Sequence, residues 1–251
     1  MHIRVLGSGA GGGFPQWNDN GENCRGVRAG NPNFKARNQS SITVSSNGID
    51  WILFNASPDI RAQIESFPPL QPARKIRDTG ITSIVITDSQ IDHTTGLLSL
   101  REHDKPWDIY CTKSVYEDMT TGFPIFNILE HFRGVNWHEV STEQISYEIP
   151  KADNIIFTAV PLQSEAPPYS PHRHNTVPGD NVGYKMEDTK TGKNLFYAPG
   201  LGVIEDHVYE YLKNADVVLI DGTVWTLSLI HISEPTRQEA ISYAGVCLKK
   251  K

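Results

Sequence analysis

The chain has 251 residues, 38% of them hydrophobic and 21% charged, a composition ordinary for a globular protein large enough for one α/β domain. A net charge of −6 argues against a nucleic-acid partner, and no apolar run approaches the roughly 20 residues that cross a membrane. The three cysteines lack paired spacing and the N-terminus lacks a secretory pattern, so we expect a cytoplasmic protein without a disulfide framework.

The first part of the chain predicts a strand, a loop and a hairpin. Residues 3–6 are a short apolar run that indicates a strand. Residues 7–33 are rich in Gly, Asn and Pro and predict a long ordered loop. Residues 41–44 and 51–54 predict the strands of a hairpin, because the Asn47-Gly48 pair between them suits a tight turn.

The rest of the chain alternates between predicted strands and helices. Helices are expected from Pro58 onward and over residues 94–101, 113–120 and 206–212. Strands are expected over residues 81–86, 107–111, 154–161, 182–186, 194–198 and 217–221. Strands interleaved with helices indicate an α/β architecture, and the hairpin argues against a purely parallel sheet.

Residues 7–12, Gly-Ser-Gly-Ala-Gly-Gly, match the G-x-G-x-x-G pattern of dinucleotide-binding loops. That use requires a helix to begin at the loop, so that its N-terminus meets the pyrophosphate. Gly13-Phe14-Pro15 follows instead, without helical periodicity. We therefore favour a turn that lets the backbone pass close to another group.

A second candidate site is Asp88-x-Gln90-x-Asp92-His93, which follows an apolar strand. Carboxylate and imidazole groups that converge at a strand end suit Zn, Fe or Mn. Taken alone, the pattern is better explained by an aspartate that caps the next helix beside a hydrogen-bonded histidine.

This segment aligns with the H-x-H-x-D-H motif of the metallo-β-lactamase superfamily. Three further stretches resemble the PqqB family, whose members belong to the pyrroloquinoline quinone (PQQ) pathway. They are residues 11–18 (GGGFPQWN), residues 164–173 (SEAPPYSPHR) with 178–181 (PGDN), and residues 197–202 (YAPGLG) with 219–223 (LIDGT). The resemblance covers about residues 1–226 and implies an α/β, metallo-β-lactamase-like αββα sandwich.

The resemblance also marks departures from the superfamily pattern. Hydrolases of the superfamily hold a first zinc with the two leading histidines, where this chain has Asp88 and Gln90. A later histidine aligns with Ser164, and a bridging aspartate aligns with Pro199-Gly200. An amide is a poor ligand for a metal that prefers imidazole or thiolate. We therefore expect the first metal position to be lost.

What remains is the second metal position. The resemblance implies an iron-dependent hydroxylase of the tyrosine ring in a Glu-Tyr-derived PQQ precursor, acting alongside other PQQ biosynthesis proteins. It implies that Asp92 and His93 are catalytic and hold the metal, Fe(II) or alternatively zinc. Asp221 would lie nearby as a ligand or as the partner of a ligand, although an Asp-Gly turn explains it equally well.

Charged side chains in two loops are candidates for binding a substrate with several carboxylates. Arg25, Arg28, His172 and Arg173 could pair with those carboxylates, and a solvated loop face explains them equally well. A lone Cys24 cannot make a sulfur-rich tetrahedral site, which argues against a structural zinc.

Residues 227–251 resemble a translated sequencing adapter that runs on into poly-A, although an ordinary terminal helix is the alternative. We therefore expect an incomplete metallo-β-lactamase-like domain over residues 1–226, truncated at its C-terminus, and a non-native tail over 227–251. The resemblance places a further histidine ligand beyond residue 226. On that basis we expect this chain to hold iron poorly and to be inactive.

Two other functions stay open. A carrier that binds PQQ or its precursor and moves it onward would also tolerate a reduced metal site. A zinc phosphodiesterase of the same superfamily is the other, and Asp88, Gln90 and Ser164 argue against it.

Overall fold

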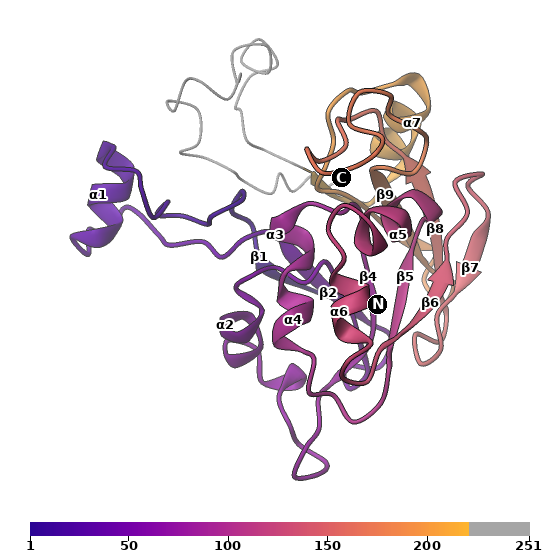
Figure 1. Ribbon diagram of the computed structural model, residues 1–251, viewed down its shortest axis with the longest axis horizontal. Helices are drawn as coiled ribbons and strands as arrows, with labels where there is room; N and C mark the ends of the chain where they lie inside the picture. The colour runs from indigo at the N-terminus through magenta and orange to yellow at the C-terminus, as the bar shows by residue number, and fades with distance from the viewer. Residues whose placement is uncertain (221–251) are drawn as a thin grey trace.

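Short apolar runs build a first sheet of six strands in the computed structural model, which describes residues 1–220 (Figure 1). Its strands, in spatial order, are β1 (His2–Gly7), β2 (Ser41–Ser45), β3 (Trp51–Phe54), β4 (Ile81–Val85), β5 (Trp107–Cys111) and β6 (Val135–Glu139). The strands from β1 to β3 pair antiparallel, whereas β3 to β6 run parallel. The carboxyl ends of β3, β4 and β5 therefore meet at one edge.

A second sheet of five strands faces the first. Its strands are β7 (Ser146–Glu148), β8 (Ile155–Pro161), β9 (Val182–Asp188), β10 (Lys193–Ala198) and β11 (Val217–Ile220), in the spatial order β11-β10-β9-β8-β7. All its pairs are antiparallel except β10 with β11.

Helices cover the outer side of each sheet (Figure 1). Those on the first sheet are α2 (Ile60–Glu65), the 3-10 helix η1 (Pro68–Leu70), α3 (Ile91–Thr94), α4 (Gly96–Ser99), α5 (Lys113–Thr120) and α6 (Ile125–Leu129). The second sheet carries α7 (Asp206–Asn214). The layers are thus helix, sheet, sheet and helix, which confirms the αββα sandwich.

Three apolar clusters hold these layers together. Between the sheets, the rings of Phe54, Phe157 and Tyr184 are fully buried and pack against one another. A second cluster joins the first sheet to α2, η1, α4, α5 and α6, and a third joins α7 to the second sheet through Val208 and Phe196. Burying a side chain of this size stabilises the fold by about 1.5–3 kcal/mol.

The predicted loop over residues 7–33 was wrong in one part. A short helix, α1 (Glu22–Arg28), forms within it, on an arm that projects from the body of the molecule (Figure 1). The ring of Phe34 packs where a Cβ of Gly26 would be, so this glycine lets the aromatic ring cover the helix. Gly26 lies within the helix, and because glycine has a low helix propensity the sequence did not predict one here.

The helix expected over residues 94–101 begins earlier and is divided into α3 and α4. The Asp88 carboxylate accepts a hydrogen bond from Gln90 N at 3.0 Å, and Thr94 Oγ1 donates to Gln90 O at 2.8 Å. These bonds fix the first turn ahead of the predicted start. As a result, Asp92 and His93 lie on a helix rather than on a loop.

Besides α1, the sequence prediction missed four elements, namely η1, α6, β6 and β7. The strands β6 and β7 lie at the edges of their sheets and bury few side chains, so they lack the apolar runs that mark a central strand. Within residues 1–220, every helix is too short or too polar to traverse a lipid bilayer.

Candidate metal centre

The candidate centre lies where the first sheet meets the second. After β4, the chain continues through Thr87 and Asp88, which pair with the start of β9: Val182 N donates to Thr87 O at 2.9 Å, and Asp88 forms a bridge with Asn181. The chain then turns into α3, which carries Asp92 and His93. Parallel strands ending at one edge thus place a polar segment at the boundary between the sheets.

Asp92 and His93 converge on one side of α3. Asp92 Oδ2 lies 3.8 Å from His93 Nε2. The Asp92 side chain is 23% exposed, whereas His93 is buried. A carboxylate and an imidazole at this spacing can donate to one ion, and the partial exposure of Asp92 leaves a route to it.

Asp88 lies behind the histidine, on the side away from Asp92. Its two carboxylate oxygens are 2.7 and 2.8 Å from His93 Nδ1. Burial alone would raise the pKa of the Asp88 carboxyl, but the charge and hydrogen bond of His93, with the Thr87 hydroxyl and the Gln90 amide, hold that pKa below its ordinary value. Asp88 is therefore an ionised acceptor at neutral pH.

A buried network fixes Asp88 in turn. Thr87 Oγ1 donates to Asp88 Oδ2 at 2.8 Å, and Thr87 N donates to Asn55 Oδ1 at 3.0 Å. Asn55 follows β3 and has a left-handed φ of 60°, which turns its side chain toward Thr87. The segments that follow β3 and β4 therefore fix the same carboxylate, that of Asp88.

Glycines bring two loops close to these carboxylates. A Cβ on Gly11 would lie 3.4 Å from Asp92 Oδ2, so the glycine-rich turn after β1 passes directly over this side chain. No helix begins at that turn, since α1 starts at Glu22, and this confirms the turn rather than the dinucleotide loop. A Cβ on Gly200 would lie 3.4 Å from Asp88 Oδ2, so the absence of a side chain at this position leaves room for Asp88.

An aromatic side chain borders the same carboxylates. Tyr169 Oη donates to Ser89 O at 2.5 Å. Burial raises the pKa of Tyr169 above its usual range, and the charges of Asp88, Asp118 and Asp92 raise it further. The phenol stays protonated at neutral pH and remains a hydrogen-bond donor beside the centre.

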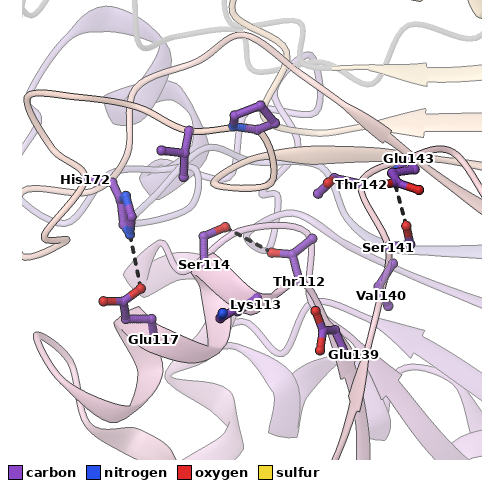
Figure 2. Close-up of a pocket in the computed structure, with 12 residues that line it drawn as sticks. Thr112, Lys113, Ser114, Glu117, Glu139, Val140, Ser141, Thr142, Glu143 and His172 are labelled. Carbon is purple, nitrogen blue, oxygen red and sulfur yellow. Dashed lines mark hydrogen bonds and ion pairs between the residues drawn. The ribbon is translucent and has the colours of Figure 1, made fainter.

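His172, which we predicted to bind substrate, lies elsewhere. It lines a cavity of about 650 Å³ between α5 and the loops after β6 and before β9, and its Nε2 is 3.3 Å from Glu117 Oε2 (Figure 2). Thr112 and Ser114 line the same cavity. Neither Asp92 nor His93 does. No motif in the sequence predicts this cavity, because its lining comes from four separate segments.

The three arginines predicted to bind substrate are not brought to the metal pair. Arg25 and Arg28 lie on α1, and Arg28 is held by carbonyl groups of its own arm, Asp19 O and Gln16 O. Arg173 donates to Ala166 O at 2.6 Å and pairs with Glu165 at 2.8 Å. Their role in binding substrate stays a prediction.

The lone cysteine of the arm is a buried thiol. Cys24 is 1% exposed, and burial together with Asp19 raises the pKa of its thiol. A raised pKa disfavours the thiolate that would bind a metal.

The residues present fit a metal ion in part. The carboxylate of Asp92 and the imidazole of His93, oriented from behind by Asp88, are an oxygen and nitrogen donor pair that Fe(II), Mn(II) and Zn(II) accept. Within residues 1–220 no cluster of three or more His, Cys, Asp or Glu could hold an ion. Asp221, the third residue predicted for the site, lies outside the described residues.

Comparisons with known proteins point to one family. A family model described as a beta-lactamase superfamily domain matches residues 50–247. Coenzyme PQQ synthesis protein B of Nitrosococcus oceani is 58% identical over 231 residues, covering 90% of this chain and 75% of that protein. The protein of the same name from Methylobacillus flagellatus is 57% identical, covering 90% and 74%.

Solved structures agree with the sequence matches. The crystal structure of Zn²⁺-bound PqqB from Methylobacterium extorquens aligns with a TM-score of 0.78 at 30% identity, covering 93% of this chain and 78% of that one. A diphosphatase of the PhnP family aligns with a TM-score of 0.63 at 20% identity, covering 86% and 72%, and shows a shared fold.

Proposed function

The chain belongs to the PqqB family of the metallo-β-lactamase superfamily, and from this we propose that it acts as an Fe(II)-dependent hydroxylase on a tyrosine ring. Its place in PQQ biosynthesis follows from the family. The finer proposal is that the substrate is a glutamate–tyrosine-derived precursor, received from and passed on to other proteins of the same pathway.

The observation that carries the proposal is the convergence of Asp92 and His93, with 3.8 Å between Oδ2 and Nε2. One carboxylate with imidazole and open coordination positions is the donor type of non-haem iron oxygenases. The hydrolases of this superfamily place a histidine where Asp88 stands, and here Asp88 is hydrogen-bonded to His93 instead. That arrangement favours a single ion over a pair of zinc ions. Zinc, which the M. extorquens relative binds, could occupy the same donors.

The side chains at the centre have different roles in this proposal. Asp92 and His93 would hold the ion, and a bound Fe(II) would supply the redox chemistry with O₂. Tyr169, protonated at neutral pH and hydrogen-bonded to Ser89 O, keeps the adjoining loop fixed. The aromatic C–H bond is replaced by C–OH, and the second oxygen atom leaves as water with two electrons and two protons from an added reductant.

The proposal is tested with isotopically labelled O₂, a glutamate–tyrosine dipeptide and ascorbate as reductant. The N. oceani relative and this chain are assayed side by side, with Fe(II) from one equivalent to a large excess. We expect labelled oxygen in the relative's product and little or none from this chain, because the residues that the structure describes bring only Asp92 and His93 together as donors, and two donors hold a metal weakly. An Asp92→Ala variant of this chain should abolish any label that large excesses of iron produce.

Other outcomes separate the competing functions. No label from the iron-loaded relative, together with tight binding of PQQ, would replace the proposal with a carrier. Cleavage of a phosphodiester with Zn(II) would replace it with a hydrolase. A full equivalent of iron retained by this chain after desalting would contradict the expectation of weak holding.

A further inference from the structure

Both carboxylate oxygens of Asp88 contact the imidazole ring of His93. Asp88 Oδ1 accepts a hydrogen bond from Gln90 N just before α3, and both oxygens of Asp88 also lie within 2.8 Å of His93 Nδ1. Asp88 is 1% exposed and His93 is 6% exposed, so water does not compete for this contact. The contact fixes the orientation of the imidazole ring.

The same contact selects a tautomer. An ionised carboxylate only accepts hydrogen bonds, so Nδ1 must carry the proton that lies between it and Asp88. In the neutral imidazole, Nε2 then has the lone pair, and this is the nitrogen that faces Asp92. A histidine that donates through one nitrogen to a carboxylate is a better ligand through the other.

The surroundings are built to keep Asp88 in place. Thr87 Oγ1 holds Oδ2, and Asn55 holds Thr87. On the open side, Gly200 has no side chain, and a Cβ there would come within 3.4 Å of Asp88 Oδ2 and 3.1 Å of Asn181 Oδ1. An acidic side chain at position 200 would add a second negative charge beside Asp88.

We propose that Asp88 is a positioning residue that locks His93 in the Nδ1–H tautomer, with Nε2 directed toward the ion held with Asp92. The inference rests on the proposed function in one respect only, namely that Asp92 and His93 bind a metal. The tautomer of His93 can be measured without a metal, so the two can fail separately.

Asp88→Asn is the variant that tests the inference. The amide oxygen would remain as the acceptor for Gln90 N, and the NH₂ group would then face His93 Nδ1 and favour the opposite tautomer. Asp118→Asn is the matched control, because Asp118 is equally buried and bonds to Ser89 rather than to His93. Nitrogen NMR of labelled histidines reads the tautomer, and chelator competition with Zn(II) and Fe(II) reads the dissociation constant.

We expect Nδ1–H in the metal-free wild type, a shift toward Nε2–H in Asp88→Asn, and about a 10- to 100-fold weaker metal affinity in that variant. The Asp118→Asn variant should match the wild type in both readouts. An unchanged tautomer, or an unchanged affinity in a folded Asp88→Asn protein, overturns the inference. A tautomer shift in a chain whose wild type binds no metal supports the positioning and overturns the proposed function.

Discussion

Gly96 joins α3 to α4 and lies directly against the backbone that follows β3. A Cβ there would be 2.2 Å from Ser57 O and 2.7 Å from Ala56 O. The same backbone holds the centre, because Ala56 N donates to His93 O at 2.7 Å and Gly96 N donates to Ala56 O at 2.8 Å. One glycine thus sets how closely the helix that carries the metal pair approaches the sheet.

We therefore expect Gly96→Ala to destabilise the protein by about 1–3 kcal/mol, the usual cost of forcing extra volume into a packed site. Metal affinity should fall as well, because the helix must move to admit the methyl group. Urea unfolding and chelator titration measure the two effects. Gly192→Ala is the control, since a Cβ there meets nothing within 4 Å and the only cost is a left-handed φ of 67°. Equal losses in both variants would contradict this account.

At the scale of an element, α5 depends on Thr112. The Thr112 hydroxyl accepts a hydrogen bond from Val115 N at 3.3 Å and donates to Gly179 O at 2.7 Å. It caps the helix and ties it to the loop that leads into β9. Two backbone groups, Val115 N and Gly179 O, therefore rely on one hydroxyl.

We expect Thr112→Ala to cost about 2 kcal/mol, because a lost cap and a stranded carbonyl each cost about 1 kcal/mol or more. Thr112→Ser keeps the hydroxyl and should recover most of that stability. Chemical denaturation of the two variants provides the comparison. If serine is as damaging as alanine, the methyl group rather than the hydroxyl is what matters.

The success of sequence reasoning differed between elements for physical reasons. The strands β4 and β5 and the helix α5 were predicted within one residue, because buried β-branched runs and a threonine cap are local signals. The helix α1 on the arm was missed because it packs against the ring of Phe34, a residue outside the helix. A pattern within the helix itself does not reveal this contact. The edge strands β6 and β7 were missed because none of their side chains is fully buried.

In the site too, features carried by a local motif could be predicted, and features that depend on the fold could not. Asp92 and His93 are adjacent in the chain, and their convergence could be predicted from a motif. The contact of Asp88 with His93 Nδ1 could not, because it depends on how the turn between β4 and α3 folds back. The cavity bordered by His172 draws on residues from about 112 to 178, and no spacing in one sequence reveals it.

At the scale of the whole molecule, an ion pair joins the two sheets. The Met1 amino group, ahead of β1, bonds to Asp188 at the end of β9, and both side chains are less than a tenth exposed. This bond, with the backbone amides of Lys190 and Thr191, holds the pKa of Asp188 below its ordinary value of 3.8. The pair therefore stabilises the fold above pH 3.8, and its contribution is lost as the pH falls toward the lower, folded-state pKa.

We expect Asp188→Asn to lower stability at neutral pH by about 1–3 kcal/mol, the range for a hydrogen bond to a charged group. The deficit should shrink as the pH falls below 4, because the wild type then loses the same charge. Thermal unfolding across pH measures this convergence. Asp153→Asn, an exposed carboxylate nearby, serves as the control. A deficit that does not change with pH would show that the charge is not responsible.

The bridge between Asp88 and Asn181 has a mechanical consequence. The segment that carries the donor pair is fastened to both halves of the sandwich, to β3 through Ala56 and to β9 through Asn181 and Val182. An ion bound by the donor pair binds only the folded arrangement, so its binding free energy adds to the stability of the fold and of these attachments. By the same linkage, we expect a substitution that loosens either attachment to weaken metal binding, even where it lies far from Asp92 and His93.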